Sequence, residues 1–112
     1  MNTVTVKNEY AEILSSFNQD FQSAADRALQ QYLVDIIVSK IATLREKDSS
    51  FQSKYGCDYP MFSQRTADDE NFITDIENNI SQLWETDQAE WEFCYKGISD
   101  WITVLQNILT TS

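Results

Sequence analysis

Carboxylates are the only plentiful reactive side chains in this chain of 112 residues. It has 18 aspartates and glutamates and no histidine. Glu9 with Glu12, and Asp87 with Glu90, have the three-residue spacing that places both carboxylates on one face of a helix. Paired carboxylates of this kind can hold Mg²⁺. The absence of histidine removes the commonest general base at neutral pH, and with it the Ser–His and Cys–His nucleophile pairs.

The separation of these two pairs argues against catalysis. All-helical nucleotide pyrophosphohydrolases of the MazG type use two such pairs on neighbouring helices, whereas here most of the chain lies between Glu12 and Asp87. Neither Cys57 nor Cys94 belongs to a Cys-x-x-Cys spacing, so zinc is not indicated either. We expect no enzyme, no metal and no cofactor, and keep a magnesium-dependent all-α pyrophosphohydrolase as the second alternative.

A segment rich in tryptophan and carboxylates, Leu83–Phe93, is the more distinctive local feature. Trp84 and Trp91 are seven residues apart and project from the same side of a helix. Bulky aromatic side chains on a helix are most often core. The other interpretation is a docking surface of aromatic anchors ringed by acids. Its candidate partner-binding residues are Trp84, Glu85, Asp87, Glu90, Trp91 and Glu92. A buried Asp87 would need a cation, which Arg65, Lys96 or an arginine of a partner could supply.

The net charge of −10 is concentrated in the second part of the chain. Residues 1–65 hold eight acidic and seven basic side chains, whereas residues 66–112 hold ten acidic side chains and one basic. No basic residue lies between Arg65 and Lys96. Such a field repels nucleic acids and anionic lipids and attracts basic surfaces. We therefore expect a basic protein partner, no direct contact with nucleic acid and no membrane association.

The elements that carry these residues are predicted to be helices. The length fits a single domain, residues 1–112. Apolar residues recur every three or four positions from Ile13 to Leu44, which predicts a long helix. The stretch Tyr55–Pro60 is a turn, after which Asp58 can cap a short helix with Pro60 in its first turn. We expect an all-α fold: a long helical hairpin or small bundle with a short helix in the connection. Thr3–Val6 is expected to be an extended tail.

The last helix carries a heptad seam. Trp91, Cys94, Ile98, Trp101, Leu105 and Ile108 alternate in steps of three and four. Asp69 is among the residues that can cap the helix leading to this seam. If that helix were continuous from Asp69 to Ile108, the rest of the chain could not cover it. A homo- or hetero-oligomer is therefore expected, and a self-associating structural or adaptor protein is the first alternative function.

The compartment is predicted to be the cytosol. No apolar run approaches the ~20 residues of a membrane span. The first residues lack the basic and apolar regions of a signal peptide. In that compartment Cys57 and Cys94 are expected to be reduced thiols.

The residues from Phe51 to Glu92 resemble a family of small antitoxin-type proteins encoded beside TumE-like, ribonuclease-like toxins. The resemblance lies in a helix that ends in a Lys-Tyr-Gly turn, a short acidic helix and a last helix that opens on an Asp-x-x-Glu-Trp-Glu segment. The matched residues are Phe51, Lys54, Tyr55, Gly56, Phe62, Asp87, Glu90, Trp91 and Glu92. The resemblance implies a cytosolic antitoxin that neutralises a basic, nuclease-type toxin by direct binding.

Overall fold

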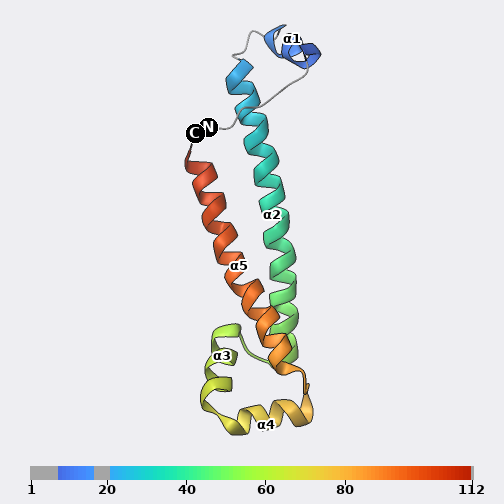
Figure 1. Cartoon of the computed structure of the whole chain (residues 1–112), viewed down its shortest axis with the longest axis vertical. Coiled ribbons are helices and arrows are strands. Elements are labelled where there is room, and N and C mark those ends of the chain that lie inside the picture. Colours follow the sequence, from blue (N-terminus) through green and yellow to red (C-terminus); the bar gives the residue numbers. More distant parts are fainter. Residues whose placement is uncertain (1–7, 17–20, 112) are drawn as a thin grey trace. The chain divides into compact units, whose positions relative to one another are not determined.

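The computed structural model describes residues 8–16 and 21–111. These ranges form five helices and no strand: α1 (Asn8–Ser16), α2 (Phe21–Tyr55), α3 (Tyr59–Asp68), α4 (Glu70–Asn79) and α5 (Trp84–Thr110) (Figure 1). The predicted all-α class is confirmed, as is the pairing of two long helices through a connection that contains short ones. Within these ranges, no helix is long and apolar enough to cross a lipid bilayer. The tail expected at Thr3–Val6 lies outside the described residues.

The chain divides into two compact units whose boundary falls inside α2, between Ile36 and Ile37. The first unit contains α1 and the start of α2. Glu9 and Glu12 are both exposed on α1. On α2 in this unit, Ala25 is buried. The candidate site lies entirely in the second unit.

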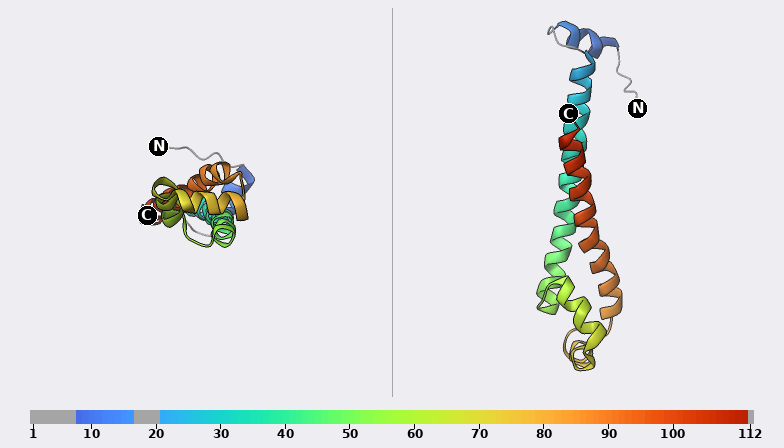
Figure 2. Two further views of the ribbon diagram at one scale, coloured as in Figure 1. Left: turned by 90° about the horizontal axis from the view of Figure 1, so that it is seen from below. Right: turned by 90° about the vertical axis from the view of Figure 1, so that its left-hand side faces the viewer.

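In the second unit, the end of α2 and the length of α5 form an antiparallel hairpin. An ion pair joins Lys54 to Asp87, and a hydrogen bond joins Asp48 to Trp91. A cation–π contact joins Lys40 to Trp101. From one contact to the next, the residue number on α5 rises while the residue number on α2 falls, as antiparallel helices require. The two views in Figure 2 show α3 and α4 at the end of the hairpin where α2 stops and α5 starts.

The turn after α2 depends on Gly56, which has a φ of 74°. This left-handed conformation costs a residue with a Cβ about 1–2 kcal/mol, so glycine is favoured there. The Gly56 amide donates a 2.8 Å hydrogen bond to the Gln52 carbonyl and so closes the last turn of α2. Asp58 then accepts a hydrogen bond from the amide of Met61, with Pro60 in the first turn of α3, as predicted.

The possibility of one continuous last helix from Asp69 to Ile108 is wrong. Asp69 does cap α4 by accepting bonds from two backbone amides, but α4 ends at Asn79 and α5 begins at Trp84. The residues around the break, Asn78 to Ser81, are poor helix formers. The Ser81 hydroxyl accepts a 3.0 Å bond from the amide of Leu83, a local alternative to helical bonding. The connection thus holds two short helices where one was predicted.

The core of this unit is an aromatic cluster at the closed end of the hairpin. Its buried members come from the end of α2, from α3 and α4, and from the start of α5. They are Tyr55, Tyr59, Phe62, Ile76, Trp84 and Trp91. Phe51, Phe72 and Ile73 pack against this cluster from positions that are partly exposed. Every element around the candidate site is therefore held by the same group of rings.

Candidate partner-binding site

Both tryptophans of the predicted docking surface are buried in the protein's own core. Trp91 has no exposed surface and Trp84 is 9% exposed. The interpretation that they are core residues is therefore confirmed, and the expectation that they act as exposed anchors is wrong. The physical reason is that α3 and α4 fold back against the start of α5 and supply the apolar contacts that these rings need.

Trp91 is the centre of the aromatic cluster. Its ring centroid lies 5.0 Å from that of Phe62, 5.5 Å from Phe51 and 5.6 Å from Tyr59. Its indole Nε1 donates a 2.7 Å hydrogen bond to Oδ1 of Asp48 on α2. Trp84 donates from its own Nε1 to Glu77 at 3.3 Å. Both polar atoms are satisfied inside the unit, as buried polar groups generally must be.

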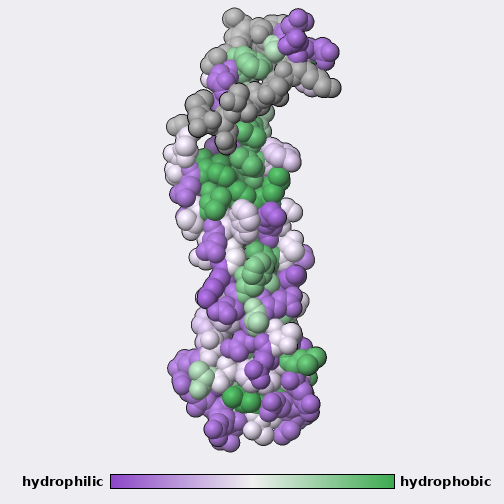
Figure 3. Space-filling model, viewed as in Figure 1, coloured by the Kyte–Doolittle hydropathy of each residue, from purple (hydrophilic) through white to green (hydrophobic). Residues whose placement is uncertain are grey.

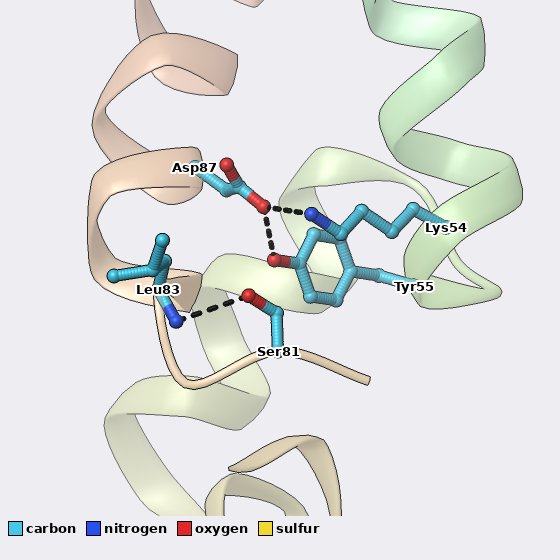
Figure 4. A network of polar contacts seen from close by, with 5 residues as sticks. All are labelled: Lys54, Tyr55, Ser81, Leu83 and Asp87. Atoms are coloured by element: carbon cyan, nitrogen blue, oxygen red, sulfur yellow. Dashed lines mark hydrogen bonds and ion pairs between the residues drawn. The ribbon is translucent and has the colours of Figure 1, made fainter. Parts of the chain in front are cut away.

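Asp87 is tied to α2 rather than presented to a partner. Its Oδ2 accepts a 2.6 Å bond from Nζ of Lys54 and a 2.5 Å bond from the hydroxyl of Tyr55 (Figure 4). The expected cation was Arg65, Lys96 or a partner's arginine, and the structure shows Lys54 instead. Lys54 lies in the last helical turn of α2. The antiparallel hairpin places this turn beside the first turns of α5.

The pKa values of this pair reflect the same contacts. Burial alone would raise the pKa of Asp87, but the hydrogen bonds from Lys54 and Tyr55 and the charge of Lys54 lower it below its ordinary value. Burial raises the pKa of the Tyr55 phenol well above its usual range, and the adjacent Asp87 carboxylate raises it further. At neutral pH the network therefore consists of a carboxylate that accepts from an ammonium group and a neutral phenol.

The other three predicted acids have different surroundings. Glu90 lies 3.8 Å from Lys47, with both side chains about half exposed. Glu92 accepts a 2.7 Å bond from Lys96 one turn later on α5. Glu85 is exposed and has no cationic partner among the described residues. Of the six predicted site residues, only Glu85 combines exposure with an unneutralised charge.

The exposed carboxylates gather instead on α4 and the segments that flank it. We call them the acidic surface: Asp68, Asp69, Glu70, Asp75, Glu77 and Glu85, all of which are exposed. No ion pair joins any of the six to a lysine or arginine in the described part of the chain. The sequence predicts an acidic binding surface within Asp58–Glu92, where no basic residue lies between Arg65 and Lys96, but the six residues singled out around the tryptophans all belong to α5.

Three members of the acidic surface already serve the local structure. Asp69 caps α4, Asp75 accepts from the amide group of Asn79, and Glu77 accepts from Trp84. Asp68, Glu70 and Glu85 make no side-chain hydrogen bond within the described residues. These three carboxylates are therefore the members whose charge can be changed without removing an internal contact.

The carboxylate pairs considered for magnesium are not assembled into an evident metal site. Within residues 8–16 and 21–111, no group of three or more potential ligands lies close enough to hold a metal ion. Asp87 already contacts an ammonium group, and Glu90 lies near another. A metal ion at this pair would have to displace Lys54 from a 2.6 Å contact.

The two cysteines are free thiols. Cys94 is buried on α5, and Cys57 is partly exposed in the turn before α3. Burial raises the pKa of both thiols. Because a nucleophilic cysteine needs a lowered pKa, neither thiol has the surroundings of a reactive one.

Most of the residues on which the resemblance was predicted lie at the closed end of the hairpin. Phe51, Tyr55 and Phe62 contact one another or Trp91 through their rings. Lys54 and Asp87 form the ion pair described above, and Gly56 makes the turn. These residues therefore determine how the chain reverses direction, and none of them is a member of the acidic surface.

No protein-family model matches this chain, and neither a curated protein nor a solved structure shows significant similarity to it.

Proposed function

We propose that this protein is a non-enzymatic module that binds a basic protein through the acidic surface of α4 and its flanks. The observation that carries the proposal is the set of six exposed carboxylates that lack a cationic partner in the described chain. Like charges at this density repel one another, and a basic partner relieves that repulsion. Complementary charge also accelerates association and makes it sensitive to salt.

The resemblance of residues 51–92 to antitoxin-type proteins suggests the class of partner. A toxin that cleaves RNA needs a basic face to hold a polyanion, and the acidic surface would occupy that face. The proposed activity is therefore that of an antitoxin, which neutralises a basic nuclease-type toxin by covering its RNA-binding surface. This mechanism requires no catalytic group and no cofactor.

The partner is sought first in the reading frame beside the gene. Its product is expressed together with the tagged chain, and co-purification is measured at low and high salt. A small, basic, nuclease-like product whose RNA cleavage stops on binding supports the proposal. A gene with no such neighbour, or a basic neighbour that does not bind, overturns the antitoxin assignment.

The acidic surface is tested by reversing the charge of its three members without internal hydrogen bonds. The triple variant Asp68→Lys, Glu70→Lys and Glu85→Lys shifts the net charge from −10 by six units to −4. We expect binding at low salt to weaken at least ~10-fold, because complementary interface charges are lost. Asp87 is left unchanged, since its reversal would break the contacts with Lys54 and Tyr55.

The matched control carries the same change in net charge at exposed acids elsewhere, Glu9→Lys, Glu12→Lys and Asp100→Lys. Circular dichroism shows whether both triple variants remain helical. If the control weakens binding as much as the test variant, net charge alone is responsible. If neither variant changes binding, the acidic surface is not the site.

A further inference from the structure

The connection between α4 and α5, residues 80–83, presents apolar side chains to solvent. Leu83 is 70% exposed and Ile80 is 39% exposed. In Figure 3 a hydrophobic patch lies where α4 leads into α5, next to hydrophilic residues of α4. Figure 4 shows that the side chain of Leu83 points away from Tyr55, a member of the aromatic cluster. Leu83 therefore contributes little to the core of its own unit.

Leu83 does not help α5 to begin either. It occupies the N-cap position of this helix, where residues with a short polar side chain are strongly preferred and leucine is disfavoured. Its side chain makes no capping hydrogen bond. A residue that departs from a local preference without serving the fold is expected at a functional position.

Hydrogen bonds of the backbone hold Leu83 in place. Its amide donates a 3.0 Å bond to the Ser81 hydroxyl, and its carbonyl accepts a 3.1 Å bond from the amide of Asp87. The amide of Ser81 donates a 2.9 Å bond to the carbonyl of Ile76, which is buried. An apolar side chain on a backbone positioned in this way loses little further freedom on binding, which favours its use as an interface anchor.

Carboxylates without a cationic partner flank Leu83 on both helices. Glu85 follows it on α5, and Glu77 of α4 accepts a 3.3 Å bond from the indole of Trp84, the residue next to Leu83. Glu77 and Glu85 belong to the acidic surface, and neither forms an ion pair with a lysine or arginine of the described chain. An apolar side chain in these surroundings fits an apolar pocket whose rim is basic.

Phe93 shows that exposure alone does not single out Leu83. Exposed apolar side chains are common on proteins, and Phe93 on α5 is 72% exposed. Its acidic neighbour Glu92, however, forms a 2.7 Å ion pair with Lys96. The two carboxylates that flank Leu83 have no such partner in the described chain.

We propose that Leu83 is the apolar anchor of the partner interface, and that the basic partner receives it in an apolar pocket bordered by lysine or arginine side chains. This inference rests on the proposed function, because it names a contact beside the acidic surface. A second copy of the chain does not fit here, since residues 66–92 hold nine acidic side chains and no basic one, and two such segments repel each other. The carboxylates speed the approach of the basic pocket, and the buried leucine slows its release.

The probe is a pair of short helical peptides with the same number of lysines. One peptide carries leucines along the opposite face of its helix, and the other carries glutamines at those positions. Each is titrated into the full chain at low salt and followed by NMR. We expect the leucine peptide to bind at least ~5-fold more tightly, because it removes apolar surface of Leu83 from water. The largest shifts in the chain are expected at Ile80 and Leu83.

Leu83→Asn tests the anchor, and Phe93→Asn is the matched control because both side chains are highly exposed. The preference for the leucine peptide should disappear in Leu83→Asn and persist in Phe93→Asn. Neither substitution changes the net charge or removes a buried side chain, so circular dichroism should show both variants to be as helical as the natural chain. The inference is overturned if the natural chain binds both peptides equally, or if Leu83→Asn keeps the preference.

The glutamine peptide reports on charge alone and therefore tests the proposed function separately. The triple charge reversal of the acidic surface should weaken its binding. If that peptide binds the natural chain and the triple variant equally, the acidic surface is not the site and the proposed function fails. If the reversal weakens binding but the leucine peptide has no advantage, the proposed function stands and the anchor is wrong. Shifts centred on the C-terminal half of α5 would also overturn the anchor.

Discussion

Asp48 and Trp91 stand 43 residues apart in the chain and are joined by a 2.7 Å hydrogen bond from the indole Nε1 to Oδ1. This bond ties α2 to α5 at the edge of the aromatic cluster. It also explains why a fully buried indole in the second half of the chain carries no unsatisfied donor. The stability of the hairpin therefore depends on an acid that the sequence does not single out.

Replacement of Asp48 by alanine is expected to lower the free energy of unfolding by about 1–3 kcal/mol, because the indole loses its acceptor in a buried position. Asp48→Asn retains an acceptor and should cost less. Urea unfolding, followed by circular dichroism, measures both. Equal losses in the two variants would mean that the charge of Asp48, and not its hydrogen bond, is what matters.

The ion pair of Asp87 makes stability depend on acid pH. Because the folded pKa of Asp87 is lowered, its contribution is present above the unfolded pKa of about 3.9 and is lost as the pH falls through the lower folded value. We expect Asp87→Asn to be less stable than the natural chain at pH 7, with the difference shrinking at acid pH. Unfolding by urea across this range measures it. Glu85→Gln, at an exposed position, should leave the profile unchanged.

Gly97 allows α5 to approach α2 closely, since a Cβ at this position would lie 3.1 Å from Cδ1 of Leu44. Gly97→Val is expected to lower the free energy of unfolding by about 1–3 kcal/mol, because the added atoms overfill this contact. Leu44→Ala in the same chain makes room, so the double variant should lose less than the sum of the single losses. Additive losses, measured in urea, would show that the two residues do not compete for space.

Gly56 is expected to resist substitution because of its backbone and not because of crowding. No atom lies within 4 Å of a Cβ built at this residue, but its φ is 74°. Gly56→Ala should cost about 1–2 kcal/mol, and Gly56→Asn less, since asparagine tolerates this conformation better. Thermal unfolding measures the difference. Ser53→Ala, an exposed helical position one turn earlier, serves as the control and should not destabilise the chain.

Local signals predicted the local structure of this protein well. Asp58, Pro60 and Asp69 mark helix starts through their own side chains, and each is found at the start of a helix. The break between α4 and α5 could not be found in the same way. The spacing of three and four residues in the seam continues backwards through Trp84 and Ile80, so the apolar pattern is the same with or without a break.

The candidate site was harder to predict because its parts are defined by contacts between distant segments. Whether Trp91 is buried depends on Phe51 and Phe62. Whether the charge of Asp87 is neutralised depends on Lys54. None of these partners is near in sequence. The excess of acid between Arg65 and Lys96 was visible in the sequence. Which of those acids keep a free charge became visible only with the fold.

The aromatic cluster also bears on how the chain acquires its fold. Its buried members fall between Tyr55 and Trp91, so they meet through short loops, whereas Lys40 and Trp101, farther along the hairpin, meet across a longer one. Closing a short loop costs less conformational entropy than closing a long one. We expect the region around the turn between α2 and α5 to fold first and the pairing of the two helices to extend from it. Folding should be rapid, as is typical of proteins rich in local contacts.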